Sequence, residues 1–136
     1  MARILVIDDE PLICSMLDIG LTRAGHEVMT ASNGEEAISL YTKAPAQIVI
    51  VDVIMPEKDG LETIRELRDK NPGLKIIAIS GGSRIGNLDL LQLAREFGAT
   101  KVFNKPLDHN QLLSTIDECV GSALGENVVD FQKRTT

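Results

Sequence analysis

Cysteine is scarce in this sequence of 136 residues, and its two occurrences form neither a metal motif nor a redox motif. Cys14 and Cys119 stand far apart, without a Cys-x-x-Cys pair or a Cys/His ligand spacing. A disulfide framework or a zinc site is therefore not indicated. We expect two reduced, buried thiols, as is typical of a cytosolic protein.

Long apolar runs and clusters of positive charge are also missing. No run approaches the ~20 residues of a membrane span, and the N-terminus enters a strand at once, without the regions of a signal peptide. The net charge is −6, and no group of Lys and Arg forms the basic stripe that a phosphate backbone requires. We therefore expect a cytoplasmic protein that binds neither membrane nor nucleic acid. The acidic balance suits a divalent cation or a basic partner better.

The sequence does contain several short apolar runs rich in Val and Ile. Such runs are typical of strands buried on both faces, as in a parallel sheet covered by helices. Helical spacings separate them, which predicts an α/β fold: one doubly wound sheet of five parallel strands with five helices, in a single domain. The predicted strands are residues 4–7, 27–31, 47–52, 74–80 and 101–104. The predicted helices are residues 11–24, a segment opened by Asn33-Gly34, a segment around Leu61 to Leu67, a segment from Leu88 to Phe97, and a last helix capped by Asp108.

Four of these strands end on side chains suited to phosphoryl chemistry. Asp8 and Asp9 follow the first strand, Asp52 ends the third, Ser80 ends the fourth, and Lys105 follows the fifth. In a parallel sheet the carboxyl ends of the strands share one edge, where ligands bind. Three carboxylates at that edge repel one another by ~4 kcal/mol per pair at 4 Å and an effective dielectric of 20. A divalent cation such as Mg²⁺ is the natural counter-charge.

The same residues belong to motifs that occur in a fixed order. These motifs are Asp8-Asp9, Asp52 to Pro56, Asp59-Gly60, Ser80 and Lys105-Pro106. In order and spacing they resemble the receiver domains of bacterial two-component response regulators, over about residues 3–120. The resemblance implies a flavodoxin-like sheet with strand order 2-1-3-4-5. It also implies a receiver domain, which we assign to residues 1–122. The amphipathic pattern fades from Gly121 onward, which predicts that residues 123–136 are a C-terminal tail or the stub of a linker.

The resemblance further implies a magnesium site and its ligands. Asp9 and Asp52 would bind Mg²⁺ directly, the backbone carbonyl of Ile54 would be a third ligand, and Asp8 would act mostly through water.

For the chemistry, the resemblance implies that Asp52 takes a phosphoryl group from a phosphohistidine. The donor would be a sensor histidine kinase or a histidine phosphotransfer protein. Lys105 would supply positive charge, and the Ser80 hydroxyl would donate to a phosphoryl oxygen. The protein would then be a signalling module rather than an enzyme, acting on a downstream protein target through altered contacts.

Each residue taken singly has a simpler explanation. Asp8, Asp9 and Glu10 before Pro11 could serve helix capping alone, Ser80 could be a turn residue, and Lys105 could be a solvated surface lysine. Asp52 has no capping role, because it ends an apolar strand before a Met-Pro pair. The four positions together favour the phosphoryl site.

Three departures from the family pattern bear on switching and lifetime. Val102 stands where relatives carry Tyr or Phe, and Phe103 should point to the opposite side of its strand. Residues 81–86 lengthen the loop after the fourth strand. Ile54 and Gly82 occupy positions where many relatives place polar residues that modulate dephosphorylation.

Other functions remain as alternatives. A haloacid dehalogenase-like phosphatase would need a second Asp where Ile54 stands. A nucleotide-binding module would need glycines in the turn from Asp9 to Leu12. A receiver-fold scaffold that ignores phosphate is left open by Val102, and the chain could also be a receiver fragment of a larger regulator or hybrid kinase.

Overall fold

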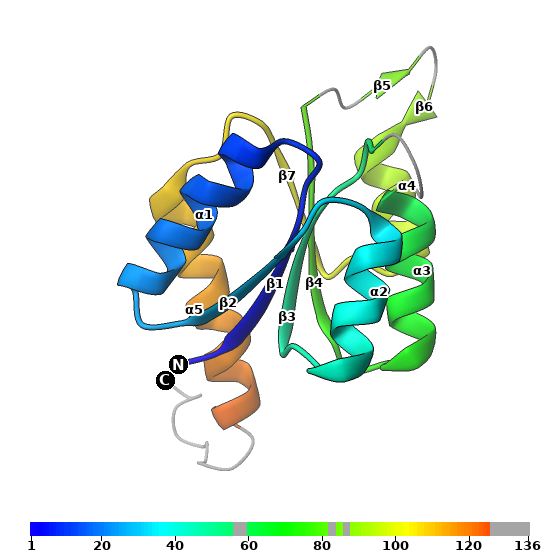
Figure 1. Ribbon diagram of the computed structural model, residues 1–136. Coiled ribbons are helices and arrows are strands. Elements are labelled where there is room, and N and C mark those ends of the chain that lie inside the picture. Colours follow the sequence, from blue (N-terminus) through cyan, green and yellow to red (C-terminus); the bar gives the residue numbers. More distant parts are fainter. Residues whose placement is uncertain (56–59, 82–83, 86–87, 126–136) are drawn as a thin grey trace.

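The computed structural model describes residues 1–55, 60–81, 84–85 and 88–125. Strands and helices alternate along most of the chain (Figure 1). The elements run in the order β1 (Arg3–Ile7), α1 (Pro11–Arg23), β2 (Glu27–Ala31), α2 (Gly34–Lys43), β3 (Ile48–Asp52), α3 (Gly60–Lys70), β4 (Lys75–Ser80), β5 (Arg84–Ile85), β6 (Leu88–Asp89), α4 (Leu90–Phe97), β7 (Lys101–Asn104) and α5 (His109–Gly125).

Five strands form the central sheet, in the order β2-β1-β3-β4-β7. Every neighbouring pair is parallel. The strand order reverses between β1 and β3, because the chain first moves outward to β2 and then crosses to the other side of β1. The predicted α/β fold, doubly wound with order 2-1-3-4-5, is confirmed. Its switch point places the ends of β1 and β3 side by side.

Helices cover both faces of the sheet: α1 and α5 pack on one, and α2, α3 and α4 on the other (Figure 1). Alternate residues of the central strands belong to two different apolar cores, one on each face of the sheet. Leu5 and Val49 belong to the core under α2 to α4, whereas Ile4 and Ile50 belong to the core under α1 and α5. Because successive side chains of a strand point to opposite faces, strands buried on both sides must be apolar throughout.

Local capping signals set the starts of two helices. The Asn33 side chain accepts a hydrogen bond from the Glu36 N–H at 2.8 Å, and the Glu36 carboxylate accepts one from the Ser32 N–H at 2.7 Å. At α5 the Asp108 carboxylate accepts from the Gln111 N–H at 3.2 Å. Both starts had been predicted from the sequence, since side-chain oxygens satisfy N–H groups that the first helical turn leaves without a partner.

The segment between β4 and α4 differs from the prediction. Leu88 lies in the short strand β6, which pairs antiparallel with β5, and α4 begins only at Leu90. The Asp89 carboxylate caps α4 through the Gln92 N–H at 3.2 Å. The predicted helix end is correct: Gly98 closes α4 with a φ of 127°, which glycine adopts without steric cost.

Helix α5 continues to Gly125, past the predicted domain end at residue 122. Residues 126–136, most of the predicted tail, lie outside the described residues, so the domain boundary stays a prediction. Among the residues that the structure describes, none of the helices combines the length and the apolar character needed to cross a membrane.

Candidate functional site

The strands β1, β3, β4 and β7 all end along the same edge of the sheet, the upper edge in Figure 1. This edge brings the three predicted acidic residues together. Asp8, Asp9 and Asp52 each offer a carboxylate oxygen, and these oxygens lie within 4.8 Å of one another. Asp8 and Asp52 are buried, whereas Asp9 is exposed. Two carboxylates of the cluster are therefore buried, and the third is open to solvent.

Lys105 reaches the acidic cluster from the segment after β7. Its Nζ lies 3.2 Å from Asp52 Oδ2 and 3.5 Å from Asp8 Oδ2. Burial lowers the pKa of the Lys105 amine, but the attraction of the Asp52 and Asp8 carboxylates outweighs that effect, so the net pKa is raised. Lys105 is therefore an ammonium at neutral pH and the fixed positive charge of the site.

Burial raises the pKa of both Asp8 and Asp52 above the ordinary value for aspartate. For Asp8 the hydrogen bond from the Glu10 N–H opposes this rise, and for Asp52 the Ile54 N–H and the Lys105 charge oppose it. The ionised carboxylates are thus less stable here than in water despite their partners. Such a site gains from an additional cation.

The other predicted residues also lie at this edge. Ser80 is fully buried at the end of β4, and its carbonyl accepts a hydrogen bond from the Lys105 N–H at 2.9 Å. The Ile54 N–H donates to Asp52 Oδ1 at 3.0 Å, which fixes one oxygen of that carboxylate. The role of the Ile54 carbonyl as a metal ligand stays a prediction.

Helix capping does not account for the acidic residues before Pro11. Glu10 is the N-cap residue of α1, yet its side chain makes no capping hydrogen bond. Asp8 Oδ1 instead accepts from the Glu10 N–H at 2.9 Å, so it holds the turn that leads from β1 into α1. The side chains of Asp8 and Glu10 both turn to Lys105.

Two residues of the site escaped the sequence reasoning. Glu10 Oε1 lies 3.2 Å from Lys105 Nζ, a contact across 95 positions that no local pattern signals. Gly60, the first residue of α3, packs directly on the backbone below the site. A Cβ at Gly60 would lie 2.6 Å from Val53 Cα and still closer to the Asp52 carbonyl oxygen. The sequence marked Gly60 as part of the Asp59-Gly60 motif, but it did not show that the residue must lack a side chain to pack on β3.

Comparison with protein families agrees with this geometry. The family model described as "Response regulator receiver domain" matches residues 4–117. The chain belongs to the response regulator receiver family. This family match supports a phosphoacceptor signalling role and does not favour a receiver-fold scaffold that ignores phosphate.

Among curated relatives, the receiver is similar to Sporulation initiation phosphotransferase F of Bacillus subtilis, with 27% identity over 84% of this chain and 90% of that protein. It is also similar to the transcriptional regulatory protein GlrR of Escherichia coli, with 29% identity over 88% of this chain, and to the alkaline phosphatase synthesis transcriptional regulatory protein PhoP of Bacillus subtilis, with 32% identity over 81%. The chain spans only 26% of GlrR and 45% of PhoP.

Solved structures show the same fold. A response regulator receiver domain protein from Clostridium thermocellum has a TM-score of 0.82 and 32% identity, covering 90% of this chain and 97% of that one. The response regulator TrrA of Thermotoga maritima, solved in complex with Mg²⁺-BeF, has a TM-score of 0.77 and 34% identity, covering 88% and 99%.

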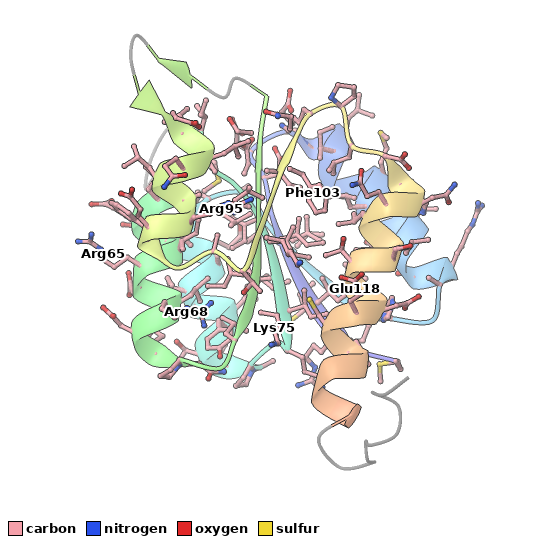
Figure 2. The ribbon with its side chains drawn as sticks, turned by 180° about the vertical axis from the view of Figure 1, so that it is seen from behind. Arg65, Arg68, Lys75, Arg95, Phe103 and Glu118 are labelled. Atoms are coloured by element: carbon pink, nitrogen blue, oxygen red, sulfur yellow. The ribbon has the colours of Figure 1, made fainter. Side chains whose placement is uncertain are left out.

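Val102 and Phe103, where the sequence predicts a departure from the family pattern, lie on β7. Val102 packs against the core under α2 to α4, whereas Phe103 packs against the core under α1 and α5. Figure 2 shows Phe103 on β7, seen from behind. The prediction that Phe103 points away from the Val102 side is confirmed. Phe103 therefore does not replace the missing aromatic ring on the α4 side.

Removal of the lysine charge is expected to destabilise the receiver in a pH-dependent way. Because the folded-state pKa values of Asp8 and Asp52 are raised, their protonation favours folding, and that stability is lost as the pH rises through those values. Without the ammonium, ionising both carboxylates costs still more. Lys105→Met should therefore lower the free energy of unfolding by about 1–3 kcal/mol at neutral pH. The loss should shrink as the solution is acidified.

Urea unfolding of both proteins over a pH series measures this difference. Lys101→Met, which removes an exposed lysine from β7, is the control and should stay within about 0.5 kcal/mol of the wild type. A loss in Lys105→Met that is equal at neutral and acid pH would show that Lys105 acts through packing alone.

Proposed function

We propose that this receiver takes a phosphoryl group from a phosphohistidine onto Asp52 and signals through altered protein–protein contacts. The donor is a sensor histidine kinase or a histidine phosphotransfer protein. The observation that supports this most is the state of Asp52: a buried carboxylate with Oδ1 fixed by the Ile54 N–H and Oδ2 facing the Lys105 ammonium. A held nucleophile beside a fixed positive charge is what phosphoryl transfer needs.

In the transfer step, an Asp52 carboxylate oxygen attacks the phosphorus atom. The new O–P bond forms as the P–N bond to the donor imidazole breaks, and the electron pair of that bond leaves with the imidazole nitrogen. Before the transfer, Oδ1 accepts from the Ile54 N–H and Oδ2 from the Lys105 ammonium. Negative charge spreads over the three other phosphoryl oxygens in the transition state, and Lys105 supplies positive charge beside them.

The acidic residues fit a resident Mg²⁺ ion. Asp9 and Asp52, with the Ile54 carbonyl, would hold it directly, and Asp8 would act through water. Hard oxygen donors and uncompensated negative charge are the environment that Mg²⁺ prefers. When bound, the ion neutralises charge that develops on the phosphoryl oxygens.

Ser80 links the phosphoryl site to the output surface. Its hydroxyl, at the end of β4, donates to a phosphoryl oxygen, and its carbonyl already accepts from the Lys105 N–H. Movement at Ser80 therefore passes to β7, which pairs with β4. With Val102 in place of an aromatic ring, this route runs through the backbone of β4 and β7, which biases a two-state surface.

The partner protein approaches over α1. Leu12, Met16 and Ile19 are large apolar residues at helical spacing, and all three are exposed on one face of that helix. The helix starts directly after the acidic residues, so this face borders the site. Ile54, also exposed, lies two residues after Asp52 in the chain. Exposed apolar patches of this kind mark protein interaction surfaces.

Intact mass after incubation with a small acyl phosphate tests the proposal. We expect one labile phosphoryl group per chain that requires Mg²⁺ and is lost in Asp52→Ala. If the folded wild-type protein gains no adduct with an acyl phosphate or with a phosphorylated kinase domain, the proposal is wrong. In that case a phosphate-independent scaffold is the better description of this receiver.

A further inference from the structure

Lys105 lies among three negatively charged partners. A lysine ammonium has three N–H donors and no acceptor. Its Nζ lies 3.2 Å from Asp52 Oδ2, 3.2 Å from Glu10 Oε1 and 3.5 Å from Asp8 Oδ2. Nζ donates hydrogen bonds to Asp52 and Glu10, and it forms an ion pair with Asp8. An incoming phosphoryl oxygen that binds this ammonium therefore competes with these carboxylates.

The three carboxylates differ in how easily they can leave. The side chains of Asp8 and Asp52 are 4% and 7% exposed, whereas that of Glu10 is 60% exposed. A buried carboxylate that loses its counter-charge has no solvent to replace it. Water replaces the lost contact at Glu10, so Glu10 is the partner whose release costs least.

Hydrogen bonds to the N–H and to the carbonyl of Glu10 fix its backbone, and its side chain reaches Lys105. Its N–H donates to Asp8 Oδ1 at 2.9 Å, and its carbonyl accepts from the Cys14 N–H at 3.1 Å. The side chain makes no helix-capping hydrogen bond. In the described part of the chain, the Glu10 carboxylate therefore contacts Lys105 and does not stabilise the start of α1.

We infer that Glu10 occupies the Lys105 donor that a phosphoryl oxygen on Asp52 takes over, and that Glu10 thereby slows phosphorylation. This inference rests on the proposed function of Asp52. Glu10 acts through Lys105 and is a positioning residue, not a reacting group. Since an exposed ion pair is weak, its removal should change the rate by about two- to fivefold.

Two substitutions separate the contact from the charge. Glu10→Gln keeps the side-chain length and removes the charge. Glu10→Asp keeps the charge but draws it back by one methylene group, away from Nζ. Both variants should take up phosphate from an acyl phosphate about two to five times faster than the wild type. Both should also change the NMR signal of the Lys105 ammonium in the absence of metal and donor.

Glu118→Gln is the matched control for net charge, because Glu118 is exposed on α5, away from the carboxyl edge of the sheet (Figure 2). Its rate should equal that of the wild type. Calorimetry should show unchanged Mg²⁺ affinity in both Glu10 variants, and urea midpoints should confirm that they are folded.

Several results would overturn the inference. An unchanged or slower rate in both variants would show that Glu10 does not compete for Lys105. A faster rate in Glu10→Gln alone would assign the effect to charge instead of contact, and a parallel change in Mg²⁺ affinity would assign it to the metal. Failure of the wild type itself to accept phosphate would contradict the proposed function instead, while the NMR comparison would still test the contact.

Discussion

The Asp52→Asn variant is expected to accept no phosphoryl group and to unfold at a higher urea concentration than the wild-type receiver. Loss of acceptance follows because a neutral amide is not a nucleophile toward phosphorus. Gain of stability follows because burial raises the pKa of Asp52, so the ionised carboxylate costs folding energy at neutral pH. The amide oxygen can still accept from the Ile54 N–H, and Lys105 keeps Asp8 and Glu10 as partners.

The expected gain is about 1 kcal/mol, within the range for relief of an unfavourable functional site. Equilibrium urea unfolding at neutral pH and intact mass after phosphodonor treatment measure the two effects on one sample. The sign of the stability change depends on pH. Below the folded-state pKa of Asp52 the wild-type carboxyl is protonated, so the advantage of the variant should disappear there. A less stable variant at neutral pH would mean that the Lys105 pair outweighs burial.

Gly60→Ala is expected to lower the free energy of unfolding by about 2–3 kcal/mol and to slow phosphorylation of Asp52. The added methyl group would meet the Asp52 carbonyl oxygen and Val53 Cα, which are backbone atoms. Backbone atoms cannot move aside as the end of a flexible side chain can. The Gly60 N–H also donates to the Val53 carbonyl at 3.0 Å, so separation of the two segments would break that hydrogen bond. Asp52 would move with its carbonyl.

Gly121→Ala is the matched control, because a Cβ at Gly121 in α5 would have no neighbour within 4 Å. Alanine is a better helix former than glycine, so this variant should be equal to the wild type or up to about 1 kcal/mol more stable. Thermal unfolding and the phosphorylation rate are measured for both. Wild-type stability in Gly60→Ala would show that α3 shifts freely against β3.

The physics of strands and turns made most of this fold predictable from the sequence. Continuous Val and Ile runs specify strands buried on both faces, so the β1, β3 and β4 runs were assigned correctly. Asn33-Gly34 was assigned as a helix start and Asp108 as a cap because their chemistry acts within four residues. The hairpin of β5 and β6 was missed, since strands of two residues carry no periodic signal.

In the candidate site, too, some features could be predicted from the sequence and others could not. The sequence by itself determined that Asp8, Asp9, Asp52, Ser80 and Lys105 share one edge, because each stands at or just after the end of a predicted parallel strand and such ends meet. Only the tertiary structure decided that Glu10 pairs with Lys105 and that Gly60 leaves room for the Asp52 backbone. Both depend on distances between segments far apart in the chain, and no local pattern of residues encodes such distances.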